Sequence, residues 1–284
     1  MKKRFSGIYV EIGNICNLKC SFCSPTKRAP RRMSAAEFSS VLPKIAPFTD
    51  NVYLHVLGEP MCHPELDAIL KELAAYGMKA SITTNGTLLK SRGDIILNNS
   101  SAVHRVSISL HSLEANCGAD MSLSEYVASC AEFARLASAR GIYSVFRLWN
   151  LDGEKNTMNE DILSSLYEGF PPPHEKRYAG LRLARNVFLE YASVFTWPKD
   201  SEAEPVSDGT CHGLLAHIAI LSDGTVVPCC LDSDGDIPLG NIFEQELSDI
   251  LSGERAAAIK RGFECRKYVE PLCQKCTYAR RFTK

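Results

Sequence analysis

Apolar and polar positions alternate in regular blocks along the first two-thirds of the chain. Short apolar runs predict strands at 7–12, 51–57, 80–84, 103–110 and 143–149, with a further strand expected at 186–195. Amphipathic segments between these runs predict helices. The clearest are a helix opened by the capping-box pair Ser34 and Glu37, and one over 123–140 that ends at Gly141. Repeated strand–helix units predict a parallel sheet with right-handed crossovers, and hence an α/β fold.

The pattern changes after a polar stretch at 197–210. Residues 217–230 form two β-rich arms around Asp223 and Gly224, which predicts a hairpin, and a helix is expected over 244–261. We therefore predict two domains, at residues 1–205 and 206–284. The core of the second domain is thin, and a bound metal would help to hold it together.

Charge and composition exclude several classes of protein. The chain has 32 basic and 33 acidic residues, so no strong overall field attracts nucleic acid or a membrane surface. No apolar run approaches the roughly 20 residues that span a bilayer. Glu11 interrupts the N-terminal segment before a signal peptide is complete. We expect a cytoplasmic protein whose 12 cysteines are reduced, and clustered reduced cysteines more often bind metal than form disulfides.

Three of the cysteines stand close together after the first predicted strand, at Cys16, Cys20 and Cys23. Thiolates at this spacing can hold an iron–sulfur cluster, whose usual ligand set is four cysteines. With three ligands, one iron keeps an open coordination position. A zinc site completed by a distant side chain fits the spacing equally well.

The cysteine loop, with Phe22 just before its third cysteine, resembles the signature of the radical S-adenosylmethionine superfamily. Residues 57–60 after the second strand are similar to the family's Gly-Gly-Glu-Pro motif, with Leu57 in place of the first glycine. Residues 83–86 and 107–111 also match family motifs, in the expected order. The resemblance covers most of residues 6–200 and implies a partial (β/α)6 TIM-type barrel.

The resemblance implies a [4Fe–4S] cluster on the loop, with S-adenosylmethionine bound at its open iron. Reductive cleavage of S-adenosylmethionine would give a 5′-deoxyadenosyl radical that abstracts a hydrogen atom from the substrate. The family's cofactor contacts carry over to Phe22 at the adenine, to Gly58, Glu59 and Pro60 at the methionine amine, and to Asn85 and Ser109 at the ribose or carboxylate. An electron donor such as flavodoxin or ferredoxin is implied as a partner.

A second group of cysteines lies in the last quarter of the chain. It includes a Cys-x2-Cys pair, a spacing typical of metal ligands. The region resembles the SPASM and Twitch extensions of the same superfamily, without the further cysteines of the full SPASM pattern. The resemblance implies a Twitch-like domain with one auxiliary [4Fe–4S] cluster, held by Cys211, Cys229, Cys273 and Cys276. Zinc is the alternative occupant. Cys230 is expected to pack, because neighbours in a strand face opposite sides, and Cys265 either replaces a ligand or stays free.

Four basic residues follow the cysteine loop with no acid among them, namely Lys27, Arg28, Arg31 and Arg32. They are expected to form a solvated loop or, alternatively, to recognise an acidic or phosphorylated substrate. Cys62, Cys117 and Cys130 are expected to pack.

The sequence offers two candidate catalytic residues. Asp232 could substitute for an aspartate that the sulfatase-maturing branch carries directly after the hairpin cysteine, where this chain has Cys230. Arg147, on the fifth strand, would be costly to bury unpaired and is expected to face the cofactor carboxylate or the substrate.

The preferred hypothesis is a radical S-adenosylmethionine enzyme. Its substrate would be a peptide, a protein or a small molecule such as an amino sugar. The competing hypothesis is a non-enzymatic protein that binds zinc or nucleic acid. The balanced charge and the order of motifs at successive strand ends argue against it.

Overall fold

The computed structural model describes residues 3–116, 122–153 and 156–282. The chain forms two compact units, and neither is one continuous stretch. The first unit combines Met1–Ile15, Ser24–Gly58 and Phe195–Lys284, and the second combines Cys16–Cys23 and Glu59–Val194. The domain boundary predicted after residue 205 stays a prediction.

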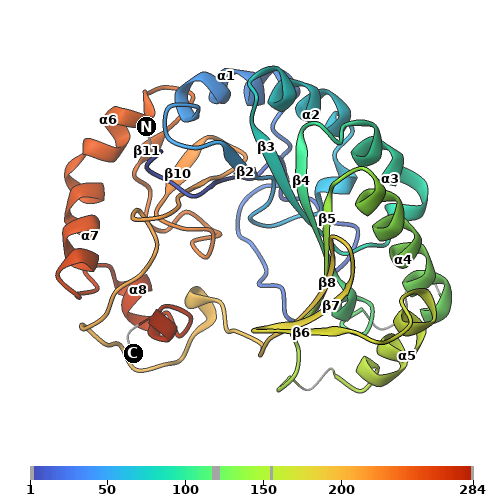
Figure 1. Cartoon of the computed structure of the whole chain (residues 1–284). Coiled ribbons are helices and arrows are strands. Elements are labelled where there is room, and N and C mark those ends of the chain that lie inside the picture. Colours follow the sequence, from blue (N-terminus) through green and yellow to red (C-terminus); the bar gives the residue numbers. More distant parts are fainter. Residues whose placement is uncertain (1–2, 117–121, 154–155, 283–284) are drawn as a thin grey trace. The chain divides into compact units, whose positions relative to one another are not determined.

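The second unit is a sheet with helices on one face. Its parallel strands are β3 (Lys79–Thr84), β4 (Val103–Ser109), β5 (Tyr143–Leu148) and β8 (Val187–Tyr191). The helices that cover it are α2 (Leu66–Ala75), α3 (Leu89–Asn98), α4 (Leu123–Ala139) and α5 (Asn159–Gly169) (Figure 1). Each helix buries an apolar stripe, as Leu66, Ile69, Leu70 and Leu73 do in α2. The predicted α/β fold is confirmed.

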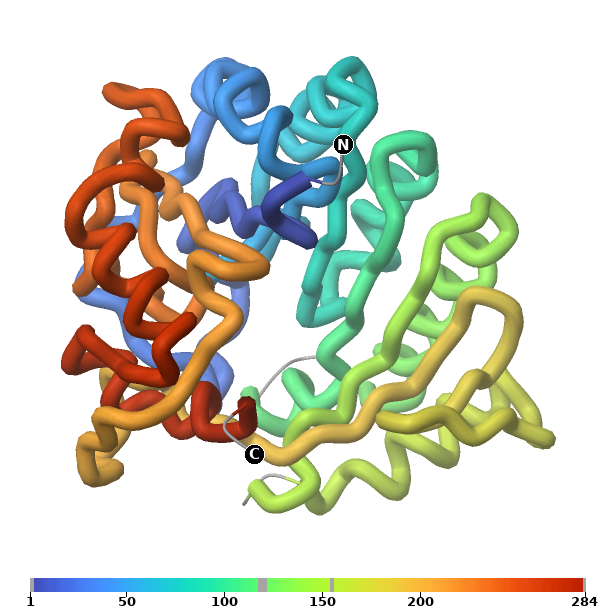
Figure 2. Tube along the Cα trace, turned by 60° about the vertical axis from the view of Figure 1, so that its left-hand side comes forward, coloured from blue at the N-terminus to red at the C-terminus, as the bar shows by residue number. Residues whose placement is uncertain are grey.

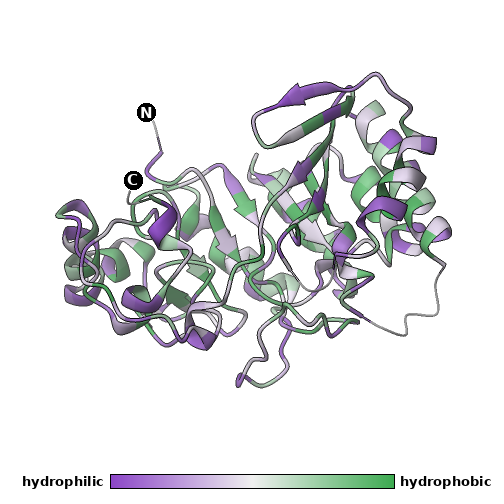
Figure 3. Ribbon diagram, turned by 90° about the horizontal axis from the view of Figure 1, so that it is seen from below, coloured by the Kyte–Doolittle hydropathy of each residue, from purple (hydrophilic) through white to green (hydrophobic). Residues whose placement is uncertain are grey.

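An antiparallel hairpin extends this sheet beyond β8. It consists of β6 (Glu175–Arg177) and β7 (Gly180–Ala184), coloured yellow in Figure 2. The whole of β6 is exposed and appears as a hydrophilic strand in Figure 3. Charged side chains on an edge strand discourage pairing with another chain. The hairpin was not predicted, because its strands carry no apolar run.

The first unit contains the remaining strands, in the order β11-β10-β9-β1-β2. Their bounds are β1 (Ile8–Val10), β2 (Asn51–Tyr53), β9 (Ala219–Ile220), β10 (Thr225–Val227) and β11 (Gly240–Asn241). β1 lies between β2 and β9 and is parallel to both. The predicted hairpin is present as the antiparallel pair β9 and β10. The capping box of Ser34 and Glu37 opens α1 (Ala35–Ile45) as predicted.

One helix that the sequence predicts as continuous is interrupted in the structure. Residues 244–261 were expected to form a single helix, but the structure has α6 (Leu247–Ser252) and α7 (Glu254–Glu264). Gly253 separates them in an extended conformation, with ψ at 152°. The apolar periodicity continues through Gly253, so the sequence predicts one helix. Glycine has a low helix propensity, however, and the helix is interrupted there. Shorter helical segments are α8 (Pro271–Lys275), η1 (Pro60–Cys62), η2 (Leu110–Ser112), η3 (Pro198–Asp200) and η4 (Ala279–Phe282).

A helix that crosses a membrane needs about 20 apolar residues. Within the described ranges, every helix falls short of the length and hydropathy that a membrane span needs. The longest, α4, has 17 residues and is amphipathic.

Candidate functional site

The cysteine loop (Cys16–Cys23) belongs to the second unit and is held by residues at the strand ends. Asn85 directly follows β3, and its Nδ2 donates to Asn17 Oδ1 at 2.9 Å and approaches Cys16 Sγ at 3.8 Å. Leu18 N also donates to Cys16 Sγ, at 3.4 Å. The side chain predicted to contact a cofactor therefore fixes the first cysteine and its neighbour.

Asn116 holds the second cysteine of the loop in a similar way. Its Nδ2 donates to Cys20 Sγ at 2.9 Å and to Ser112 O at 2.7 Å, while its Oδ1 accepts from Lys19 N at 2.7 Å. No sequence pattern indicates Asn116, because it is a lone asparagine outside any motif or periodic segment. Asn116 is thus a positioning residue for the loop.

The surroundings of the loop cysteines suit thiolate ligands of an iron–sulfur cluster. Burial raises the pKa of the Cys20 thiol, while the Asn116 hydrogen bond lowers it. A thiolate in such a place is stabilised by a positive metal beside it and by N–H donors that point at its sulfur. Among the described residues, no three Cys, His, Asp or Glu side chains lie close enough together to bind a single metal ion.

Replacing Asn116 with leucine should lower the reduction potential of a cluster bound to this loop. Hydrogen bonds to the sulfurs favour the reduced, more negative cluster, and the expected shift is on the order of tens of millivolts. The measurement is a redox titration followed by electron paramagnetic resonance. Asn116→Asp places a carboxylate near the sulfur and should shift the potential further in the same direction. An unchanged potential in Asn116→Leu would contradict the positioning role.

The segment Gly58–Pro60 has a conformation that requires glycine at its first position. Gly58 has φ at +77°, and a Cβ atom there would lie 2.3 Å from Gly13 O. The next residue, Glu59, is buried, and its oxygens accept from Met61 N at 2.9 Å and from Asn85 N at 2.7 Å. Burial raises the pKa of Glu59 to about 7, against the lowering effect of these hydrogen bonds. Pro60 is also buried and begins η1.

An aromatic contact connects the loop to the end of β4. The rings of Phe22 and His111 have centroids 4.8 Å apart, and His111 Nδ1 lies 3.0 Å from Arg147 O. Burial lowers the pKa of His111, which favours the neutral imidazole. Tyr126 donates its hydroxyl to Asn85 O at 2.6 Å, and the same oxygen lies 3.4 Å from Ser109 O. The motif residues of β3 and β4 thus meet at the carboxyl ends of their strands.

The four predicted auxiliary ligands belong to the first unit, and their thiols influence one another electrostatically. Burial raises the pKa of each of these thiols, and neighbouring thiols of the same group raise the pKa of Cys211, Cys229 and Cys273 further. Backbone N–H groups point at two of the sulfurs, from Gly213 N to Cys211 at 3.5 Å and from Ala279 N to Cys276 at 3.4 Å. The donor set fits an iron–sulfur cluster, as in the first loop.

The other cysteines occupy varied surroundings. Cys230 packs against an apolar cluster that includes Val56, Leu57 and Val227, and burial raises its pKa to about 11. Cys265 is exposed at the end of α7, and Cys130 is buried in α4. Cys62 Sγ lies 3.6 Å from Asn17 Oδ1, so it contacts the cysteine loop. Cys117 lies outside the described residues.

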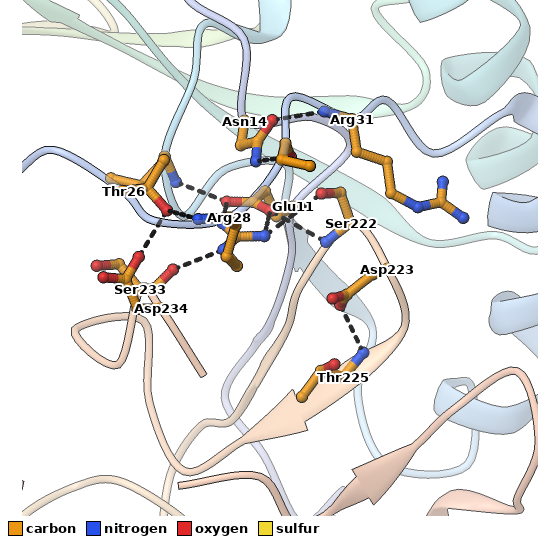
Figure 4. Close-up of polar contacts among 12 residues, drawn as sticks. Glu11, Asn14, Thr26, Arg28, Arg31, Ser222, Asp223, Thr225, Ser233 and Asp234 are labelled. Atoms are coloured by element: carbon orange, nitrogen blue, oxygen red, sulfur yellow. Dashed lines mark hydrogen bonds and ion pairs between the residues drawn. The ribbon is translucent and has the colours of Figure 1, made fainter. Parts of the chain in front are cut away.

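Arg28 contradicts the prediction of a solvated or substrate-binding basic loop. Its guanidinium forms a two-pronged ion pair with Glu11, with distances of 2.6 and 2.7 Å, and Figure 4 shows this contact. The Glu11 side chain is 0% exposed and that of Arg28 only 11%. The acid stands 17 positions earlier, on the segment that continues β1, so the local sequence gave no indication of the pair.

Glu11 also joins three segments of the first unit. Its oxygens accept from Leu57 N at 3.1 Å and from Ser222 N at 3.0 Å. Arg28 Nε donates to Ser233 O at 2.9 Å, which adds the segment after the cysteine pair Cys229–Cys230. A buried ion pair with hydrogen bonds of this kind favours a single arrangement of the chain segments that it connects.

Two aspartates, Asp232 and Asp234, form further hydrogen bonds in the segment after Cys229–Cys230. Asp234 accepts from Thr26 Oγ1 at 2.6 Å and pairs with Lys199 Nζ at 2.7 Å. Asp232 is buried, and its oxygens accept from Asp236 N at 2.8 Å and Ile237 N at 2.9 Å. These contacts favour a structural role for Asp232, and its catalytic role stays a prediction.

The chain belongs to the radical SAM superfamily, whose family model matches residues 10–166, more than half of the chain. A second model, SPASM, described as an iron–sulfur cluster-binding domain, matches residues 211–277. The two matched ranges contain the two cysteine groups described above.

The curated relatives match only a part of this chain. The probable GTP 3′,8-cyclase of Methanocella arvoryzae is 29% identical over 114 residues, which is 39% of this chain and 36% of that protein. The matches to the curated relatives span between 24% and 36% of those proteins' lengths.

Two solved structures share the fold over nearly the whole chain. BtrN in complex with AdoMet and 2-DOIA aligns with a TM-score of 0.64 and 19% identity, covering 98% of this chain and 94% of that one. SuiB of Streptococcus suis bound to its precursor peptide SuiA aligns with a TM-score of 0.63 and 16% identity, covering 98% and 73%. At this level of identity, the likeness concerns the fold alone.

Proposed function

We propose that the chain is an enzyme that cleaves S-adenosylmethionine reductively and uses the resulting radical to take a hydrogen atom from a substrate. The observation that carries the proposal is the loop of three cysteines, whose first two sulfurs accept from Leu18 N and Asn116 Nδ2 at 3.4 and 2.9 Å. Cys16, Cys20 and Cys23 would hold a [4Fe–4S] cluster, which would supply the electron for the reductive cleavage of S-adenosylmethionine.

The chain's own residues have binding and positioning roles in this proposal. Asn85 and Asn116 orient the thiolates of Cys16 and Cys20. Phe22, beside His111, offers a ring for the adenine. The buried Glu59 carboxylate, held by the backbone N–H groups of Met61 and Asn85, is a candidate acceptor for the methionine ammonium. Ser109 and Arg147, paired across β4 and β5, are candidates for the methionine carboxylate.

The auxiliary site is assigned to Cys211, Cys229, Cys273 and Cys276. Their proximity supports one auxiliary [4Fe–4S] cluster, as a Twitch-like domain would carry. Such a cluster can accept an electron from a substrate radical or bind a substrate atom directly. Electrons for the first cluster would come from a flavodoxin or ferredoxin in the cytoplasm.

Cys273→Ala should remove the auxiliary iron and leave the first cluster in place. Its thiol lies among the other auxiliary thiols, whereas the cysteine loop is a separate stretch of the chain. Anaerobically reconstituted protein should then hold about four irons in place of about eight. Uncoupled formation of 5′-deoxyadenosine should continue. A variant with its full iron content would contradict the assigned ligand set.

The substrate is proposed to be a small molecule or a peptide. The fold likeness to BtrN, whose structure holds 2-DOIA, supports a small molecule, and the likeness to SuiB supports a peptide. The name of the cyclase relative adds nucleotides to the small molecules that deserve testing.

One anaerobic experiment tests the proposed function against zinc or nucleic-acid binding. The protein is reconstituted, its iron and sulfide are counted, and S-adenosylmethionine and dithionite are added. Formation of 5′-deoxyadenosine by a protein with about eight irons supports the enzyme. A colourless zinc protein that forms none of this product, and that binds DNA or RNA in a salt-dependent manner, supports the alternative.

A further inference from the structure

Helix α4 carries a buried tyrosine, Tyr126, whose hydroxyl lies against the turn that follows β3. The side chain is 0% exposed, and its hydroxyl donates to Asn85 O at 2.6 Å. Burial raises the pKa of Tyr126 well above its ordinary value, so the hydroxyl keeps its proton and remains a donor. The apolar stripe of α4 needs only a ring at this position, which phenylalanine would also supply. The hydroxyl therefore adds a directed contact to the packing of the ring.

The turn that Tyr126 contacts, Asn85–Gly86, packs closely against α4. Gly86 has φ at +81°, in the left-handed region that favours glycine. A Cβ atom there would lie 2.9 Å from Cys130 Sγ and 3.1 Å from Tyr126 Oη. Gly86 N also donates to Thr84 Oγ1 at 3.1 Å. The backbone of the turn is thus held by the helix and by the end of β3.

Asn85 connects this turn to Glu59 and to the cysteine loop, all within the second unit. Its backbone N–H donates to Glu59 Oε2 at 2.7 Å, and its backbone carbonyl accepts from Tyr126. Its side-chain Nδ2 donates to Asn17 Oδ1 at 2.9 Å and lies 3.8 Å from Cys16 Sγ. One residue therefore contacts the helix, a predicted cofactor residue and the loop.

Three side chains form a closed hydrogen-bond cycle at the start of the cysteine loop. Asn85 Nδ2 donates to Asn17 Oδ1, Asn17 Nδ2 donates to Thr87 Oγ1 at 2.9 Å, and Thr87 Oγ1 donates to Asn85 Oδ1 at 2.7 Å. Hydrogen bonds in such a network strengthen one another, so the three side chains hold their positions together. Because Asn17 directly follows Cys16, a shift of Asn85 would move the first cysteine of the loop.

We infer that Tyr126 is a positioning residue for the cysteine loop, acting through Asn85 on Cys16. Its hydroxyl fixes the carbonyl of Asn85, and the hydrogen-bond cycle transmits that position to the loop. Outer partners of this kind orient the ligands of a metal centre, and hydrogen bonds to the sulfurs tune an iron–sulfur cluster. For its effect on the cluster the inference rests on the proposed function, whereas its effect on the loop requires no turnover.

The first test is hydrogen exchange in Tyr126→Phe, which removes the hydroxyl and keeps the aromatic ring. In the anaerobically reconstituted holoprotein, the amides of 16–20 and 84–88 should exchange about fivefold faster than in the wild type. One ordinary hydrogen bond contributes about this factor to the equilibrium between closed and open states. Mass spectrometry of the two peptides measures the change, and unchanged exchange in both would overturn the inference.

The second test is the reduction potential of the cluster on the loop, from a redox titration followed by electron paramagnetic resonance. Tyr126→Phe should lower the potential, because the Asn85 amide is no longer held beside the Cys16 sulfur. An unchanged potential would contradict the positioning role. If the wild-type protein formed no 5′-deoxyadenosine, the proposed function would fail, but the exchange measurement would still decide the inference.

Two further variants test the route from Tyr126 to the loop. Asn85→Leu removes the amide, so adding Tyr126→Phe to it should lower the potential no further. An additional drop as large as that of Tyr126→Phe alone would show that Tyr126 acts without Asn85, and would overturn the inference. Thr87→Val opens the cycle at a half-buried position and should accelerate exchange in 16–20, a test that remains decisive if Tyr126→Phe fails to fold. Unchanged exchange in Thr87→Val would refute the route.

Phe133→Leu is the matched control on the same helix. Phe133 is 4% exposed and packs against Gly93 of α3, away from the Asn85–Gly86 turn. The variant should lower the thermal midpoint at least as much as Tyr126→Phe does, because it removes buried apolar volume. It should leave the cluster potential and the exchange of 16–20 unchanged. Equal effects of the two variants on the potential would mean that Tyr126 only stabilises α4, and would overturn the inference.

Discussion

Replacing Arg28 with methionine should destabilise the protein by about 3–5 kcal/mol, the usual cost of removing one partner of a buried ion pair. The reason is the carboxylate of Glu11, which is 0% exposed and would be left without its counter-charge. Its two remaining hydrogen bonds, from Leu57 N and Ser222 N, cannot replace the lost Coulomb attraction. Urea unfolding of the anaerobic holoprotein measures the change.

Arg31→Met is the matched control for this variant. Arg31 follows in the same basic stretch and pairs with Glu37 at 2.6 Å, but about a third of each side chain is exposed. The variant should cost less than about 1 kcal/mol, as exposed ion pairs do. Equal losses in the two variants would mean that Arg28 is as solvated as the sequence suggested. The double variant Glu11→Gln/Arg28→Met should recover part of the loss, because no buried charge remains.

Cys16→Ala should reduce the formation of 5′-deoxyadenosine to the background rate. Two thiolates cannot keep the cluster of the cysteine loop, and the electron that splits S-adenosylmethionine then has no source. The iron content should fall from about eight to about four, the share of the auxiliary cluster. Chromatographic detection of 5′-deoxyadenosine and an iron assay measure the two changes.

Cys62→Ala is the control that lies next to the same loop. The Cys62 thiol is 3.6 Å from Asn17 Oδ1 but stands outside the three-cysteine motif. Its removal should leave the iron content and the cleavage rate close to those of the unaltered protein. If Cys62→Ala lost iron as Cys16→Ala does, the ligand set of the cluster would have to include Cys62.

The fold was largely predictable because its signals are local. Apolar runs indicated eight strands, namely β1, β2, β3, β4, β5, β8, β9 and β10, but not β6, β7 and β11. The pair Ser34 and Glu37 marked the start of α1, as the structure confirms. The continuous helix over 244–261 failed at Gly253, where apolar periodicity outweighed the helix-breaking residue. The hairpin of β6 and β7 escaped prediction because it is an exposed, charged edge.

The candidate site was predictable only where its residues form motifs. The cysteines, Glu59 and Asn85 stand at spacings that match family motifs, and Asn85 directly follows β3, where its side chain approaches Cys16. Their roles as ligands and cofactor contacts stay predictions. Asn116, which donates to Cys20 Sγ, belongs to no motif. The burial of Arg28 depends on Glu11 and Ser233, which are distant along the chain, so no local window of sequence reveals it.

The position of β1 between β2 and β9 has a consequence for the order of folding during synthesis. β1 spans Ile8–Val10, and its partner β9 spans Ala219–Ile220. While the chain emerges from the ribosome, β1 must wait for more than two hundred residues before its second edge is covered, a contact of very long range. Until then Glu11 lacks the N–H of Ser222, and the strand edge is open to wrong partners. The pairing of β1 is therefore completed only after β9 has been synthesised.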